Sequence, residues 1–317
     1  MSEYLAHAAV YDDVRRLALR DGSLPEAFHT ALREHPGYGR AGSITRGLFN
    51  HVVPLIDRVR AGWAPGDVSG AQRLAFALGW ISHQAADRHI KAVALVTDPA
   101  YYEPDGSGVG ISLPRIWHDL VLYDAVYGGG GDGVMPEHLF SRDARDHAAA
   151  AAFDVAALEP VVQAEWAAEL AALHGGVGEG GPAYLPDHFD AFLDARPEYY
   201  VPLDDYADRI ERPFREERQR FVRTAHFYDA DDPLVALARA PEGEGGSVAA
   251  ARAAVGPASS QYAVLLERGL AYLDAVAAYW RGETSTDAVR QALDFNTWSR
   301  GPEEETAARA LLDGYAR

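Results

Sequence analysis

The apolar stretch from residue 69 to 97 contains a histidine and an aspartate one helical turn apart. His83 and Asp87 are four positions apart, so both side chains would point to the same side of an α-helix. Residues 71 to 96 are mostly Ala, Leu, Val, Ile, Phe and Trp, which predicts a helix that is central in the fold. Such a pair often only hydrogen-bonds on a solvated face, but in an apolar helix its desolvation must be offset by a partner or a bound metal ion.

Helical spacing of apolar residues extends along most of the chain, and no sustained alternating pattern of strands appears. This predicts an all-α fold. The Gly-rich residues 174 to 182 suggest a boundary between a helical core with a His/Asp metal site, residues 1–174, and a C-terminal helical portion packed on it, residues 183–317. Helices are expected at residues 3–20, 25–34, 43–61, 69–97, 113–127, 136–173, 203–228, 247–281, 285–294 and 302–315.

Composition excludes several classes of protein. The 317 residues include no cysteine, so a disulfide framework or a Cys-ligated metal centre is impossible and any ligands must be His, Asp or Glu. A formal net charge of -18 argues against binding to nucleic acid or to anionic membranes. We find no export signal and no apolar run long enough to span a bilayer, and therefore expect a soluble cytoplasmic protein.

Three further histidines lie on separate apolar segments that are expected to be helical. These are His7, His51 and His118. A lone histidine in such a setting is usually a core residue with one hydrogen bond. Helix bundles, however, build metal sites from inward-facing histidines and carboxylates on facing helices. We therefore predict a metal site formed by His7, His51, His83, Asp87 and His118.

The order of these elements resembles the zinc-dependent phospholipase C family, which is related in fold to the S1/P1 nucleases, over about residues 1 to 127. The resemblance implies a helical bundle in which His and Asp hold zinc ions that activate water for attack on a phosphate ester. His83 and Asp87 match the HxxxD helix of that family, while the other three histidines match by order and setting. The fold expected is thus a multi-helix bundle of phospholipase C/P1 nuclease type with additional C-terminal helices.

The chain departs from the family pattern at two expected ligand positions. Lys91 stands where the family commonly has another histidine, and Leu122 stands where an acid is expected one turn after His118. A reduced site with one or two ions is therefore predicted, with zinc first and iron or manganese possible. Lys91 or Arg88 could instead contribute positive charge.

The leading hypothesis is a metal-dependent hydrolase that acts on a small phosphoester. Asp119 or Asp124 would orient the attacking water or act as general base, and Lys91 would neutralise charge on the phosphate. Asp12 follows His7 by about a turn and a half and could support the ligands, although solvation is the simpler role.

Two other classes of function stay open. The first is a metalloenzyme of another type, either an iron-dependent oxygenase or an HD-type phosphohydrolase that uses His118-Asp119 as its HD pair. The second is a non-catalytic helical protein that binds a small molecule and has lost the metal. The C-terminal helices could cover the site or form a homodimer interface. Within them, the acidic residues before Pro233 are expected to cap a helix.

Overall fold

The computed structural model describes residues 4–43, 52–97, 118, 121–122, 125–126 and 226–293. These residues form helices and no strand, which confirms the all-α class for this part of the chain. The helices are α1 (Tyr4–Ala18), α2 (Glu26–Glu34), α3 (Pro36–Ser43), α4 (Val52–Gly62), α5 (Val68–Thr97), α12 (Pro233–Arg239), α13 (Val248–Ala253), α14 (Gln261–Trp280) and α15 (Thr286–Ala292). None of them is long and apolar enough to cross a membrane.

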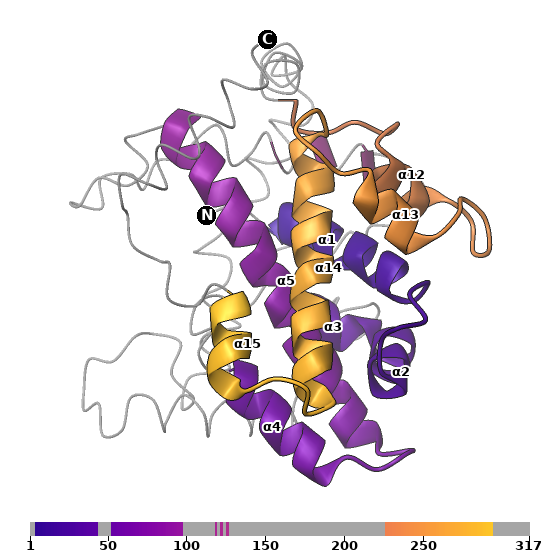
Figure 1. Ribbon diagram of the computed structural model, residues 1–317, viewed down its shortest axis with the longest axis vertical. Helices are drawn as coiled ribbons and strands as arrows, with labels where there is room; N and C mark the ends of the chain where they lie inside the picture. Colours follow the sequence, from indigo (N-terminus) through magenta and orange to yellow (C-terminus); the bar gives the residue numbers. More distant parts are fainter. Residues whose placement is uncertain are drawn as a thin grey trace, which may run out of the picture.

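Helix α5 is the centre of the described fold, as its apolar sequence predicts. It packs against α1, α2, α3, α4 and α14, and Figure 1 shows α14 beside it. From Leu74 to Asp87 every side chain of α5 is buried, so apolar contacts surround this segment on all sides. A polar group placed there is removed from water by several neighbouring helices at once.

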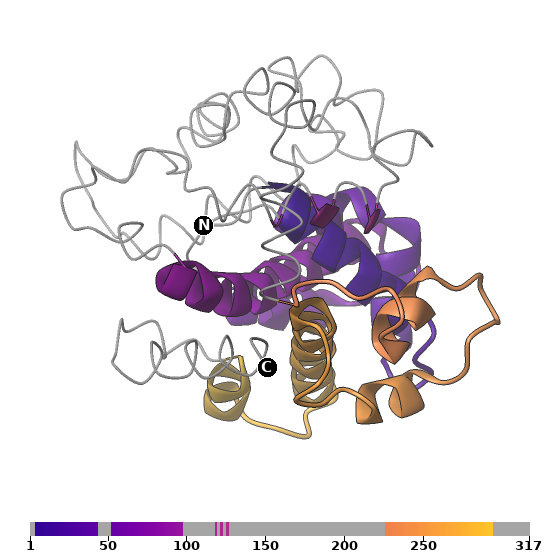
Figure 2. The same cartoon turned by 90° about the horizontal axis from the view of Figure 1, so that it is seen from above.

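The helices of the C-terminal part lie along one side of α1 to α5, as Figure 2 shows. Helix α1 contacts both α12 and α14. A buried carboxylate joins them: Asp13 accepts hydrogen bonds from Arg239 at 2.5 Å, from the Tyr262 hydroxyl at 2.8 Å and from Arg16 at 2.9 Å. Burial raises the pKa of Asp13, and the two guanidinium groups oppose this shift. We call these four residues the Asp13 cluster. The proposed domain boundary at 174 to 182 lies outside the described residues.

Three helix predictions were wrong in detail. Helix α3 was not predicted, because its sequence contains three glycines, a residue type with low helix propensity. The single helix expected at 247–281 is two helices, α13 and α14, since the chain leaves helical geometry before Ser260 caps α14 by accepting from the Ala263 amide. Residues 226–228, expected to end a helix, are not helical.

The acidic residues before Pro233 do begin a helix, α12, that was missing from the expected set. Asp232 occupies the N-cap position and Pro233 the first turn, as predicted. The Asp232 side chain nevertheless makes no capping bond within α12. It accepts a hydrogen bond of 2.7 Å from the Ser260 amide and so ties the start of α12 to the start of α14.

Candidate metal centre

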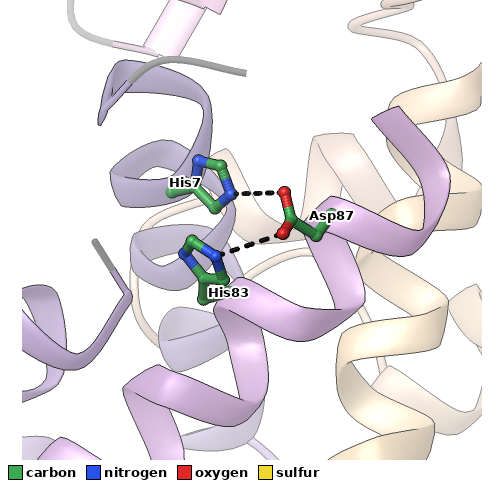
Figure 3. Close-up of side chains that lie close together, drawn as sticks. All are labelled: His7, His83 and Asp87. Carbon is green, nitrogen blue, oxygen red and sulfur yellow. Dashed lines mark hydrogen bonds and ion pairs between the residues drawn. The ribbon is translucent and has the colours of Figure 1, made fainter. Parts of the chain in front are cut away.

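Helix α1 brings His7 to the HxxxD pair of α5. His83 and Asp87 lie one turn apart on the same face of α5, and Figure 3 shows both facing His7. The Nε2 atom of His7 lies 3.3 Å from Asp87 Oδ1, and Nε2 of His83 lies 3.3 Å from Asp87 Oδ2. The two imidazole rings stack with their centroids 4.0 Å apart. Each oxygen of one carboxylate therefore faces one imidazole nitrogen.

These three side chains are close enough to hold a metal ion. Charge-assisted N–H···O bonds are usually about 2.7–2.9 Å long, so 3.3 Å is long for a protonated histidine against a carboxylate. Zinc bonds of about 2.0–2.1 Å in a tetrahedron place neighbouring ligand atoms about 3.3–3.4 Å apart. One ligand atom from each of the three residues falls within a group of atoms that all lie within 4.8 Å of one another. His7, His83 and Asp87 thus fit the donor set and the spacing of a three-ligand site.

All three side chains are buried, and for His83 burial determines the charge. His7, His83 and Asp87 are each 2 % exposed. Burial, followed by the nearby His7 imidazole, lowers the pKa of His83 to about 4, and the attraction of Asp87 only partly opposes this. His83 is consequently neutral near pH 7, which is the form in which histidine binds a metal.

The tautomer of His83 follows from a backbone contact. Its Nδ1 lies 2.7 Å from the carbonyl oxygen of Ser43, the last residue of α3. A carbonyl oxygen only accepts, so Nδ1 carries the hydrogen and donates it. In the neutral ring Nε2 then has a lone pair, and this lone pair faces a carboxylate oxygen. A neutral imidazole nitrogen and a carboxylate oxygen are both atom types that bind metal ions.

One ion pair joins α1 to α3 close to His7. Asp12 is buried and accepts a 2.8 Å hydrogen bond from Arg40 Nε. Within α3, Ser43 Oγ donates to the Arg40 carbonyl at 2.7 Å. The sequence favoured simple solvation of Asp12, whereas the structure pairs it with a guanidinium. Asp12 therefore holds α1 and α3 together near His7, His83 and Asp87.

The structure does not gather all five predicted ligands. His118 is buried, but it is not part of the group of ligand atoms, and its ring packs edge-on against Phe227 with centroids 4.4 Å apart. His51, Asp119 and Asp124 lie outside the described residues. Lys91 lies on α5, one turn after Asp87, and only its backbone is described.

The sequence analysis missed the part that α3 plays in this site. The signal was present as Gly39, Gly42 and Gly79, since glycines spaced along helices permit close approach of two backbones. Without the partner helix, those glycines indicated only a poor helix former.

Comparison of the chain with known protein families, with curated proteins and with solved structures finds no match.

Proposed function

We propose that His7, His83 and Asp87 hold a divalent metal ion, zinc being the first choice, and that the protein is a metal-dependent hydrolase acting on a small phosphoester. The observation that supports this most directly is the buried contact of two imidazole Nε2 atoms with the two oxygens of Asp87, each at 3.3 Å. Two histidines and one carboxylate leave at least one coordination position open, as in catalytic zinc sites.

The charges of His83 and Asp87 support the same proposal. A buried carboxylate attracts a cation more strongly than an exposed one, because little water screens its charge. Because His83 is held neutral and donates from Nδ1 to Ser43, its other nitrogen presents a lone pair toward Asp87. A divalent ion would bind both the carboxylate and that lone pair.

Each residue then has a specific role. When bound, a divalent ion lowers the pKa of its water toward neutrality and polarises a phosphoryl oxygen. Asp87 would supply the negative ligand, and His7 and His83 the neutral ones. Lys91, one turn further along α5, would neutralise charge on the phosphate, and Asp119 or Asp124 would orient the water.

The choice of phosphoester hydrolysis rests on the likeness of the HxxxD segment to the zinc-dependent phospholipase C pattern. A phospholipase C/P1 nuclease type of bundle, a cytoplasmic location and a homodimer belong to the same proposal. One or two ions are expected.

A second candidate follows from the donor set itself. Two histidines and one carboxylate also form the facial triad of non-haem iron oxygenases. The identity of the metal separates the two candidates, because iron with oxygen-dependent turnover contradicts a zinc hydrolase.

The test begins with elemental analysis of untagged protein purified without added metal. At least about one equivalent of zinc is expected for a single site. The His83→Ala, Asp87→Ala double variant should lose it, whereas His29→Ala, which removes a buried histidine outside the cluster, should keep it.

Hydrolysis of bis(p-nitrophenyl) phosphate and p-nitrophenyl phosphate should then follow the zinc content of these variants. Unchanged metal content in the double variant, or no uptake of metal by the wild type on titration, would overturn the proposed centre. The non-catalytic binding protein would then be favoured.

A further inference from the structure

Helix α3 lies against α5 with its backbone almost in contact. A Cβ atom added to Gly42 would lie 2.1 Å from the Phe76 carbonyl oxygen, and one added to Gly79 would lie 1.8 Å from the Gly39 carbonyl oxygen. Both clashes are with backbone atoms of the facing helix, which cannot rotate away as a side chain can. Any side chain at these positions would therefore push α3 and α5 apart.

This close contact between α3 and α5 lies next to the candidate metal centre. Gly42 immediately precedes Ser43, whose carbonyl accepts the 2.7 Å hydrogen bond from His83 Nδ1. The Ser43 carbonyl is therefore the acceptor that α3 presents to His83. The hydrogen bond determines which nitrogen of His83 carries the hydrogen and which presents its lone pair to Asp87.

The last turn of α3 is also tied to the helix that carries His7, through Arg40. The Asp12–Arg40 ion pair joins α1 to α3, and the His7–Asp87 contact joins α1 to α5. The three helices thus form a closed set of contacts in which a displacement of α3 changes the position of His83 relative to His7.

We propose that the close packing of α3 on α5 sets the orientation and the tautomer of His83, which makes Gly42 and Gly79 positioning residues for the metal centre. This inference rests on the proposed function, because it assigns those glycines a role in metal binding. It differs from a purely structural role in predicting that their substitution weakens metal binding beyond any effect on folding.

The first test compares two helical glycines. Gly42→Ala should weaken zinc binding by about 10–100-fold, the range found when the partner of a ligating histidine is removed. Gly62→Ala is the matched control, since a Cβ at that last residue of α4 meets no atom within 4 Å. Zinc affinity is measured by competition with a chromophoric chelator, on variants whose circular dichroism shows wild-type helix content.

A second measurement uses the wild-type protein and does not depend on whether a variant folds. Long-range ¹H–¹⁵N NMR of metal-free protein with labelled histidine reports which ring nitrogen is protonated. We expect the Nδ1–H tautomer for His83, and its loss in Gly42→Ala.

Three results would overturn the inference. They are an Nε2–H tautomer of His83 in the metal-free wild type, a folded Gly42→Ala protein with wild-type zinc affinity, and an equal loss of affinity in Gly62→Ala. A wild-type protein that takes up no zinc instead overturns the proposed function, and the NMR signal still reports whether α3 sets the tautomer.

Discussion

Two buried aspartates, Asp13 and Asp87, lie in different chemical surroundings. In the Asp13 cluster the carboxylate accepts hydrogen bonds from two guanidinium groups and a tyrosine hydroxyl, at 2.5–2.9 Å. In the candidate metal centre each oxygen of Asp87 faces an imidazole nitrogen at 3.3 Å. The first carboxylate is paired with fixed positive charges of the protein, whereas the second contacts two imidazole rings, a donor set that could hold a metal ion.

The contrast indicates what each aspartate does. Asp13 joins α1 to α12 and α14, elements more than 200 positions away in the chain, and its cluster resembles an ordinary buried ion-pair network. Asp87 contacts His7 and His83, and the three side chains form a group that could hold a metal ion. We therefore expect folding to depend mainly on Asp13 and metal binding mainly on Asp87.

The largest loss of stability is expected when a substitution breaks the Asp13 cluster. Asp13→Asn removes the charge that compensates Arg239 and Arg16, and losing one partner of a buried pair typically costs about 3–5 kcal/mol. Urea unfolding of metal-free protein measures the loss. Asp87→Asn is the matched variant, and it should change the stability of the metal-free protein by less, because its amide can donate to an imidazole. Equal losses from the two substitutions would remove the distinction between the sites.

The next effect concerns the pH dependence of the metal-free protein. Burial lowers the pKa of His83 from its usual 6.5 to about 4, so the folded state resists protonation and the unfolded state binds the proton first. Stability is therefore complete above pH 6.5 and falls as the pH drops toward 4, by about 3 kcal/mol in total. Urea unfolding across this pH range, compared between the wild type and His83→Gln, isolates the contribution of His83 to the stability. A variant with the same pH dependence as the wild type would contradict it.

Metal binding should stabilise the protein by a similar amount. Zinc at 100 times its dissociation constant adds about 2.7 kcal/mol to the free energy of unfolding, and a chelator removes this gain. Asp87→Asn should abolish the gain, whereas Asp13→Asn should keep it despite its lower starting stability. Thermal unfolding of both variants with and without zinc measures the gain. An equal response of the two variants to zinc would contradict the prediction.

The smallest expected effect sharpens the description of the Asp13 cluster. Tyr262→Phe removes the hydroxyl that donates to Asp13 Oδ2 and should cost about 1.5 kcal/mol, the value typical of a hydrogen bond to a charged group. In a double-mutant cycle the cost should largely disappear when Asp13 is already Asn. Zinc affinity should not change, and a marked loss would mean that the cluster also supports the metal centre.

The sequence supported some of these features strongly. Residues 69–97 were predicted as a central helix, and α5 spans Val68–Thr97, because a long apolar pattern with a period of 3.6 is hard to mistake. The pairing of His83 with Asp87 on one face followed from their spacing alone. By contrast, α3 was missed, since its glycines are poor helix formers and are useful only where another backbone packs against them.

The sequence by itself determined which residues share a helix face, that any metal ligands must be His, Asp or Glu, and that the described part of the chain is helical. Only the tertiary structure decided that His7 joins His83 and Asp87 while His118 packs against Phe227. It also decided that the Ser43 carbonyl holds the His83 ring. The physical reason is that helical periodicity is local, whereas contacts between helices depend on the packing of side chains and backbones from distant parts of the chain.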